Sequence, residues 1–270
     1  VLKGAFLAAC EAAVRDLAAG TVAGPALLVG APWRDGDRVH NAALLLDHGA
    51  IAAIRYKRHL PNYGVFDEAR LFTPGPLPEP VTFRGVRLGV MICEDMWYGD
   101  VAAALAGAGA EILLVPNGSP YELDKAGVRL DHARARVAAT GLPLIYVNQV
   151  GGQDELVFDG ASFALAADGT EVARLAPWVG VVAPTAWRRN DEGGWSGSGP
   201  LVPPPDRFEG IYQAMVTGLR DYVDKNRFPG VVLGLMVAEP HSSSSDSMPP
   251  PVTAQASTLR GGGGGGGGGG

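Results

Sequence analysis

Short apolar runs separated by helical segments most strongly constrain how this chain folds. Residues 86–93, 112–117 and 142–151 are continuous apolar runs, typical of strands that are buried on both faces. The segments between them, residues 100–110 and 124–141, are expected to be helices. This alternation of strands and helices predicts an α/β domain built in layers.

Hairpins are predicted on both sides of this alternating region. Residues 41–57 indicate two strands joined at Asp47-His48-Gly49, where glycine tolerates a positive φ, and residues 159–175 indicate a hairpin that turns at Asp168-Gly169. A further buried strand is expected over residues 26–33, after an alanine-rich helix over residues 4–19. Hairpins beside strand–helix units imply that the sheet is mixed.

Composition excludes several classes of protein. The 270 residues are 47% hydrophobic and carry a net charge of −6, which argues against disorder throughout and against a basic nucleic-acid binder. No apolar run is long enough to span a membrane and no secretory leader is visible, so we expect a soluble, cytoplasmic protein. Two cysteines and five scattered histidines predict neither a disulfide framework nor a metal site.

The character of the sequence changes after residue 187. Residues 188–206 are rich in Gly, Ser and Pro and are interpreted as a linker or long loop. A helix is expected over residues 208–226, with Ile211, Met215, Leu219 and Tyr222 on one face, followed by a buried strand over residues 228–235. Residues 236–260 are Ser- and Pro-rich and are expected to be disordered, and the last ten residues are all glycine.

Cys93 lies at the end of a predicted buried strand and is followed by Glu94-Asp95. A lone cysteine in an apolar strand is usually an inert part of the core. Its place between a strand and the next turn argues for chemistry, because backbone N–H groups at the carboxyl edge of a sheet favour a thiolate and can hold an oxyanion. Cys93 is therefore a candidate nucleophile.

A cysteine that attacks an amide also needs a base and a group that holds the developing negative charge. Lys57, at the end of a predicted strand, is a candidate for holding that charge. His59 is a candidate base in a Cys–His arrangement. Both lie in KRHLPNYGVFDEARLF, a turn-prone segment in which Asp67 and Glu68 add carboxylates. Taken singly, each of these residues is also consistent with a solvated loop.

KRHLPNYGVFDEARLF and GVMICEDMW together resemble the nitrilase, or carbon–nitrogen hydrolase, superfamily, which places a Glu–Lys–Cys triad on a four-layer αββα fold. LPNYGVFDE, NGSPYELDK and YVNQVGGQDELVFDGAS are similar to one branch of it, the glutaminase domains of glutamine-dependent NAD synthetases. Residues 211–235 resemble the lead-in to the ATP-pyrophosphatase-type synthetase domain of that branch. The resemblance covers about residues 1–235.

The resemblance implies roles for particular residues. Cys93 matches the nucleophile, Lys57 the catalytic lysine, and Glu68 a second glutamate that supports the lysine. The positions that contact substrate glutamine match Tyr63, Ser119 and Lys125. Glu94, next to the nucleophile, is also predicted to bind substrate. No cofactor is expected for this part.

The resemblance also implies a domain organisation. The expected organisation is a glutaminase domain over residues 1–187, a linker over 188–205, the start of a synthetase domain over 206–235 and an aberrant tail over 236–270. We expect the family's triad glutamate to precede Val1, and the glycine-rich loop that holds ATP to be replaced after Leu235. Glu11 is not expected to substitute, because it lies within a predicted helix. The chain is therefore expected to hydrolyse glutamine slowly. ATP, magnesium, deamido-NAD and a homo-oligomeric assembly are expected only for a full-length enzyme.

Two other functions remain open from the sequence. A stand-alone carbon–nitrogen hydrolase, acting on another amide or a nitrile, would share Lys57 and Cys93 but would have no need of Tyr63, Ser119, Lys125 or the helix over residues 208–226. A catalytically dead module that binds glutamine or a protein partner would fit the expected loss of the triad glutamate. Retention of both Lys57 and Cys93 argues against that module.

Overall fold

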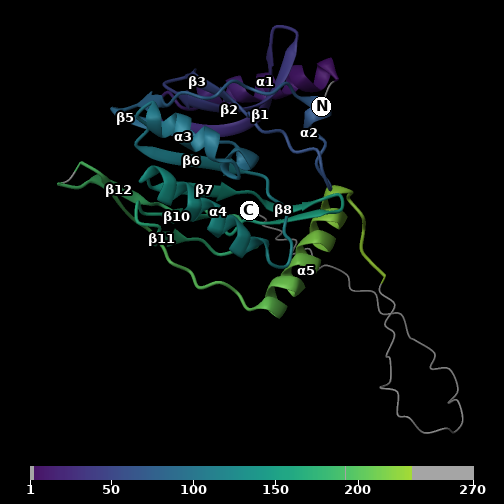
Figure 1. Ribbon diagram of the computed structural model, residues 1–270. Helices are drawn as coiled ribbons and strands as arrows, with labels where there is room; N and C mark the ends of the chain where they lie inside the picture. The colour runs from purple at the N-terminus through teal and green to yellow at the C-terminus, as the bar shows by residue number, and fades with distance from the viewer. Residues whose placement is uncertain (1–2, 192, 233–270) are drawn as a thin grey trace, which may run out of the picture.

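The computed structural model describes residues 3–191 and 193–232 (Figure 1). Its first half contains α1 (Gly4–Ala19), β1 (Leu27–Asp35), β2 (Arg38–Asp47), β3 (Ala50–Tyr56), α2 (Glu68–Leu71), β4 (Val81–Phe83), β5 (Val86–Val90), the 3-10 helix η1 (Cys93–Met96) and α3 (Gly99–Gly107). Its second half contains β6 (Ile112–Asn117), α4 (Lys125–Thr140), β7 (Leu144–Asn148), β8 (Val150–Gln153), β9 (Leu156–Asp159), β10 (Phe163–Leu165), β11 (Glu171–Arg174), β12 (Ala186–Arg189), β13 (Trp195–Ser198) and α5 (Arg207–Lys225). None of the helices within the described residues is long and apolar enough to cross a membrane.

The first three strands form an antiparallel sheet in the order β1-β2-β3. The predicted hairpin turn joins β2 to β3, and both His48 (φ 49°) and Gly49 (φ 82°) have the positive φ that a tight turn of this kind requires. Helix α1 covers one face of the sheet, where it buries Val14 and Ala18 against apolar side chains of the strands. The strand members of this cluster are Trp33, Ala42, Leu44 and Leu46.

The second sheet has six strands in the order β11-β10-β7-β6-β5-β4. Its central strands β5, β6 and β7 are parallel, whereas β4, β10 and β11 are antiparallel to their neighbours, so the predicted mixed sheet is confirmed. Helices α3 and α4 each follow a parallel strand and pack on one face of this sheet, as crossover helices do. The shared core contains Val101, Leu105, Ala133, Val137, Leu113, Leu144 and Leu165.

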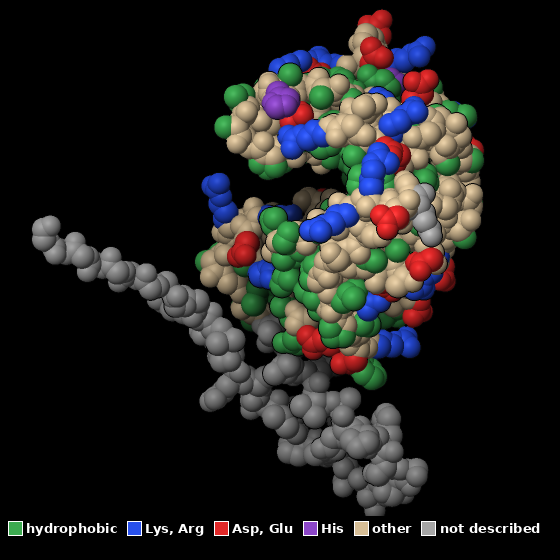
Figure 2. Space-filling view, turned by 90° about the vertical axis from the view of Figure 1, so that its left-hand side faces the viewer, with side chains coloured by type: hydrophobic (Ala, Val, Ile, Leu, Met, Phe, Trp, Pro, Cys, Tyr) green, Lys and Arg blue, Asp and Glu red, His purple; other side chains and the backbone are tan. Residues whose placement is uncertain are grey.

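A third apolar cluster joins the two sheets face to face. Ala43 of β2 meets Val90 at the end of β5, together with Ile92, Leu28 and Cys93. Three clusters separate four layers, which are α1, the three-stranded sheet, the six-stranded sheet, and α3 with α4; the expected αββα arrangement is thus confirmed. Figure 1 places α1 and the three-stranded sheet at the top, and in the space-filling view a deep notch opens between that upper part and the part below it (Figure 2).

The segment predicted as a linker, residues 188–205, contains most of a β-hairpin, and its role as a linker stays a prediction. Strands β12 and β13 pair antiparallel, with Arg189 opposite Trp195. Arg189 also forms an ion pair of 2.5 Å with Glu111, which fixes the hairpin to the loop before β6. Gly197 lies directly beneath the ring of Trp187, where a Cβ would meet ring atoms at 2.6 Å. Gly197 serves close strand packing here, which composition alone cannot distinguish from the glycine of a flexible linker.

Helix α5 confirms the predicted helix, but it packs by a face other than the apolar one. Met215, Leu219 and Tyr222 are 63%, 45% and 50% exposed, whereas Gly210 and Thr217 are buried. The strand expected over residues 228–235 is absent from residues 228–232, and residues 233–235 lie outside the described residues, as does the tail expected over 236–270. The division of the chain into two domains stays a prediction.

Small residues allow α5 to dock on β8. Asp221 of α5 accepts a hydrogen bond of 2.7 Å from the Gly152 amide, and Lys225 donates to the Gly152 carbonyl. At Gly152 an added Cβ would lie 3.2 Å from the Gly218 Cα and 3.3 Å from the Thr217 carbonyl oxygen. Helix and strand backbones therefore approach as closely as glycine permits.

Replacing Gly152 with Val is expected to loosen α5 from the rest of the chain. Forcing extra methyl groups into a packed contact costs about 1–3 kcal/mol. Trypsin should then cleave within α5, at Arg220 and Lys225, faster than in the unaltered chain. Gly180→Val is the matched control, because nothing lies within 4 Å of a Cβ at Gly180. Equal cleavage rates in the two variants would contradict this packing.

Candidate active site

Three parallel strands end at one cavity. The chain leaves β5 toward Cys93, β6 toward Gly118 and β7 toward Gln149, and all three of these residues line a cavity of about 310 Å³. This is the carboxyl edge of the parallel strands, where open α/β sheets usually bind their ligands. The other lining residues come from both sheets and the segments after them: Gly30, Asn41, Ala42, Ala43, Lys57, Glu68, Ile92, Pro116 and Asn117.

Cys93 sits in a backbone conformation that is unusual for a residue with a side chain. Its φ of 49° lies in the left-handed region, at the first position of η1. Such conformations cost about 1–3 kcal/mol and persist where surrounding contacts enforce them, frequently at functional sites. The turn lets the chain leave β5 sharply while the thiol stays at the cavity between the two sheets.

Asp95 enforces this turn and also fixes the end of the strand that carries Lys57. One carboxylate oxygen accepts from the Ile92 amide at 3.0 Å, and the other accepts from the amides of Arg58 and His59 at 3.1 and 2.8 Å. Burial raises the pKa of Asp95, and these backbone amides and the charge of Lys57 oppose that rise. This role was not predicted from the sequence, although an acidic residue two positions after Cys93 was the available signal.

Lys57 and Glu68 form a buried ion pair at the cavity. The ammonium of Lys57, whose side chain is 1% exposed, lies 2.8 Å from both carboxylate oxygens of Glu68. Asn41 of β2 donates a hydrogen bond of 3.2 Å to the same carboxylate. Glu68 thus contacts the lysine that it was predicted to support, and both line the cavity with Cys93.

The thiol of Cys93 experiences opposing influences. Burial raises its pKa most strongly, and the negative charges of Glu68 and Glu94 raise it further. The charge of Lys57 and a hydrogen bond from the Gly118 amide lower it. Because burial dominates, the net effect is a raised pKa, so the resting sulfur is a thiol that needs a base before it can act as a nucleophile.

This balance predicts how the reactivity of Cys93 depends on pH. In a Cys10→Ser background, alkylation by iodoacetamide should accelerate steadily from pH 7 to 9 without reaching a plateau, because the pKa of the Cys93 thiol lies above its ordinary value of 9.0. Peptide mass spectrometry at each pH gives the rate constant. A plateau below pH 8 would mean that Lys57 and the Gly118 amide outweigh burial.

Tyr63 and Glu94 contact each other beside this cluster. The Tyr63 hydroxyl donates to the Glu94 carboxylate, with both oxygens at 2.9 Å, and the pKa of Tyr63 is raised by burial and by this carboxylate. Glu94 is buried, whereas Tyr63 is 54% exposed. Neither lines the cavity, so their predicted contact with substrate stays a prediction.

Ser119 and Lys125 are not brought to the cavity by the structure. Ser119 is buried and its hydroxyl oxygen accepts a hydrogen bond of 3.0 Å from Arg129. The ammonium of Lys125, at the start of α4, pairs with Glu122. Gly118, directly before Ser119, does line the cavity, and it was not predicted as a site residue from the sequence. Direct contact of Ser119 and Lys125 with substrate stays a prediction.

The alternative titratable groups are engaged elsewhere. His59 hydrogen-bonds Asp100 at 2.8 Å and stacks on Tyr98, and it does not line the cavity. Glu11, within α1 as predicted, pairs with Arg34 at 2.7 Å. Neither His59 nor Glu11 lines the cavity as a base for Cys93. Lys57 does line it, as the cationic group.

A second cavity of about 410 Å³ lies between α4, the start of α5 and the loop after β11. Its walls include the apolar surfaces of Trp178, Tyr121 and Leu175, and they carry neither a cysteine nor a lysine. Three of its four acidic side chains are already engaged: Asp159 with Arg129, Glu171 with Arg174, and Asp206 with the first amides of α5. We therefore place the chemistry at the smaller cavity. Across residues 3–191 and 193–232, no three His, Cys, Asp or Glu side chains gather as metal ligands would.

Comparison with known proteins agrees with this geometry. Residues 2–186 match the family model for carbon–nitrogen hydrolases. The glutamine-dependent NAD(+) synthetase of Rhodobacter capsulatus is 48% identical over 235 residues, which cover 87% of this chain and 43% of that protein. The chain thus spans less than half the length of this relative.

Solved structures give the same result. The glutamine-dependent NAD+ synthetase from Acinetobacter baumannii, in complex with ADP, superimposes with a TM-score of 0.73 at 30% identity, covering 82% of this chain and 42% of that one. A mutant of the amidase from Nesterenkonia sp. AN1, which shows covalent addition of the acetamide moiety of fluoroacetamide at the active site cysteine, superimposes with a TM-score of 0.55 at 29% identity, covering 65% of this chain and 66% of that one.

Proposed function

The chain belongs to the carbon–nitrogen hydrolase family, and from this membership we propose that its α/β body is the glutaminase domain of a glutamine-dependent NAD synthetase. The observation that carries the proposal is the meeting of Cys93, Lys57 and Glu68 at one cavity, which Gly118 also lines. Relatives that are named as glutamine-dependent NAD synthetases support glutamine as the amide.

In the proposed reaction, the sulfur of Cys93 adds to the side-chain carboxamide carbon of glutamine, and the C=O π electrons move onto oxygen. Lys57 and the Gly118 N–H are the groups placed to hold the resulting negative charge. Collapse of this intermediate breaks the C–N bond, and ammonia leaves with the proton that the thiol gave up. Water then cleaves the γ-glutamyl thioester, which yields glutamate and regenerates the thiol.

Other parts of the proposal concern the longer protein. Ammonia would be used there to aminate deamido-NAD at the expense of ATP, with magnesium. In the present chain, the side chains proposed to contact glutamine are those of Tyr63, Glu94, Ser119 and Lys125. Assembly into a homo-oligomer and a cytoplasmic location are part of the same proposal.

An electrophilic analogue of glutamine, such as its diazoketone, tests the proposed substrate. It should modify Cys93 faster than Cys10, and free L-glutamine should protect Cys93 better than acetamide or butyramide at equal concentration. Stronger protection by the aliphatic amides would favour a stand-alone amidase. If Cys93 is modified no faster than Cys10, the cysteine is inert and the proposal fails.

Ammonia release separates the glutaminase from a module that only binds glutamine. The unaltered chain should release ammonia from glutamine, and Cys93→Ala should abolish that release while glutamine still binds. Isothermal titration measures the binding, and Cys10→Ser is the matched control because it removes the other thiol. Binding without any release in the unaltered chain would identify the catalytically dead module.

A further inference from the structure

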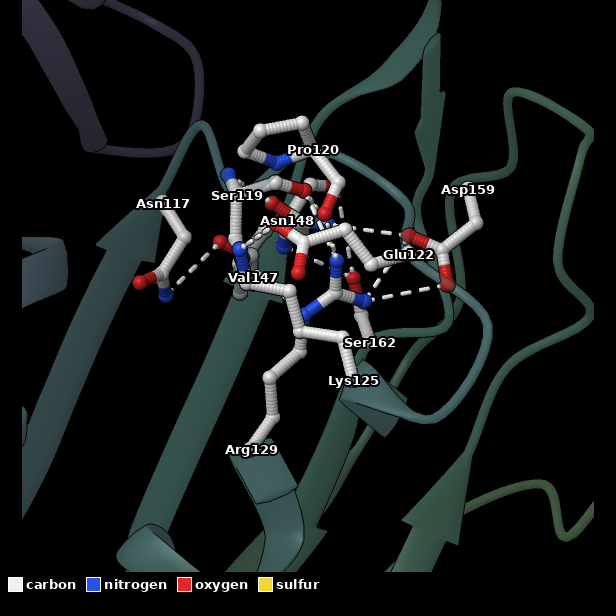
Figure 3. A network of polar contacts seen from close by, with 10 residues as sticks. All are labelled: Asn117, Ser119, Pro120, Glu122, Lys125, Arg129, Val147, Asn148, Asp159 and Ser162. Atoms are coloured by element: carbon white, nitrogen blue, oxygen red, sulfur yellow. Dashed lines mark hydrogen bonds and ion pairs between the residues drawn. The ribbon is translucent and has the colours of Figure 1, made fainter. Parts of the chain in front are cut away.

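Arg129 of α4 is a buried charged residue that the proposed reaction does not use. Its side chain is 3% exposed, and that of its ion-pair partner Asp159 is 5% exposed. One guanidinium nitrogen donates to both oxygens of Asp159, at 2.8 and 3.0 Å. Another donates to the carbonyl oxygens of Ser119 and Pro120, both at 2.8 Å, and the third to the Ser119 hydroxyl at 3.0 Å (Figure 3).

Asn148, at the end of β7, holds the same segment from the other side. Its side-chain oxygen accepts from the Ser119 amide at 2.8 Å, and its side-chain nitrogen donates to the Ser119 carbonyl at 3.1 Å. Its own backbone amide donates to the Ser162 hydroxyl at 3.0 Å. The amide, carbonyl and hydroxyl of Ser119 are therefore all bonded to buried side chains, as Figure 3 shows.

Gly118 directly precedes this fixed residue. It lines the same cavity as Cys93, and its amide lowers the pKa of the Cys93 thiol. Glycine alone has no rotamer or side-chain packing of its own to orient its peptide group, and an added Cβ would lie 3.2 Å from the side-chain oxygen of Gln149. The direction of the Gly118 N–H therefore depends on how its neighbours are anchored.

Stability alone is a weak reason for an ion pair in this position. Desolvation of two charges cancels much of their attraction, and well-packed apolar residues often serve as well or better. The guanidinium supplies a rigid set of hydrogen-bond donors for two successive carbonyl groups, which an apolar side chain cannot supply. Neither Arg129 nor Asp159 lines the Cys93 cavity, so direct contact with the substrate does not explain the pair either.

We infer that Arg129, held by Asp159, is a positioning residue that aims the Gly118 amide at the sulfur of Cys93. The inference rests on the proposed function for its place in catalysis, but its effect on the thiol is independent of the substrate. A loosened 118–120 segment would deprive the thiolate of its amide donor, so the sulfur would ionise and react less readily.

The test uses the double variant Arg129→Met/Asp159→Leu in the Cys10→Ser background. Removing both charges avoids leaving one of them buried and unpaired. Alkylation of Cys93 by iodoacetamide at pH 8 should slow about tenfold, equivalent to about 1.4 kcal/mol, and the rise of the rate with pH should shift to higher pH. Arg134→Met is the matched control, because this arginine lies on the same helix but is half exposed and outside the segment.

Two further measurements keep the inference open to refutation. Arg129→Lys keeps the charge opposite Asp159 but loses the fork of donors, and should give a smaller slowing. In the unaltered chain, the Gly118 and Ser119 amides should exchange hydrogen as slowly as those of β6. Unchanged alkylation in a folded double variant, or rapid exchange at these two amides, would overturn the positioning role. If alkylation slows as expected but the glutamine analogue does not label Cys93, the proposed substrate fails and the positioning role stands.

Discussion

Replacing Lys57 with Met is expected to reduce the rate of glutamine hydrolysis by about 10²–10³-fold, the usual effect of removing one group that stabilises an oxyanion. Lys57 is placed for two effects at once. Its charge favours ionisation of the Cys93 thiol, and its ammonium lies at the same cavity, where the carboxamide oxygen would become negative. Since the charge develops mainly during reaction, kcat should fall much more than KM rises.

Ammonia release under single-turnover conditions measures this effect without interference from thioester hydrolysis. Lys3→Met is the control, because Lys3 is an exposed lysine at the start of α1. Iodoacetamide alkylation of Cys93 in the Lys57→Met variant should also slow, but less than hydrolysis does, because alkylation develops no oxyanion. Equal losses in the two assays would show that Lys57 acts only on the thiol.

Replacing Glu68 with Gln is expected to destabilise the fold by about 3–5 kcal/mol, because it leaves the charge of Lys57 buried without a partner. For a chain of this size the melting temperature should fall by roughly 6–20 °C. Lys57→Met should cost less, because Glu68 is 19% exposed against 1% for Lys57, and it retains its hydrogen bond from Asn41.

The double variant Lys57→Met/Glu68→Gln separates the pair from its surroundings. It should regain most of the stability lost in Glu68→Gln, because no unpaired charge remains. Urea titration followed by circular dichroism gives the free energies of unfolding, and Glu155→Gln is the control, since Glu155 is exposed in the turn between β8 and β9. Additive losses in the double variant would mean that the two side chains do not stabilise each other.

Local patterns in the sequence predicted most of the layered body. The helix over residues 4–19 and the strand over 112–117 have the predicted bounds, because each depends on its own apolar periodicity. Periodicity does not tell which face of a helix meets the protein, so the packing of α5 through Gly210 and Thr217 could not be predicted. The β12–β13 hairpin was missed because Gly197, which packs closely on Trp187, has low strand propensity.

The site was predictable where a residue ends a strand. Cys93 and Lys57 follow predicted strands, and such positions converge at a sheet edge whatever the detailed packing. Asp95, Gly118 and the Arg129–Asp159 pair were not predicted, because their roles arise from contacts between different segments, such as those of Asp95 with Arg58, 37 positions away, and of Arg129 with Asp159, 30 positions away. A single sequence shows that these residues are polar or small, but not what they meet.

The double contact of Asp95 has a consequence for how the site opens. Since one buried carboxylate binds the Ile92 amide in the nucleophile's turn and the Arg58 and His59 amides after Lys57, separating the two segments would leave one of its oxygens without donors. Local unfolding should therefore release the two segments as one cooperative unit. Each such opening would interrupt catalysis completely and briefly. It would not produce a population in which Cys93 remains ordered while Lys57 has moved away.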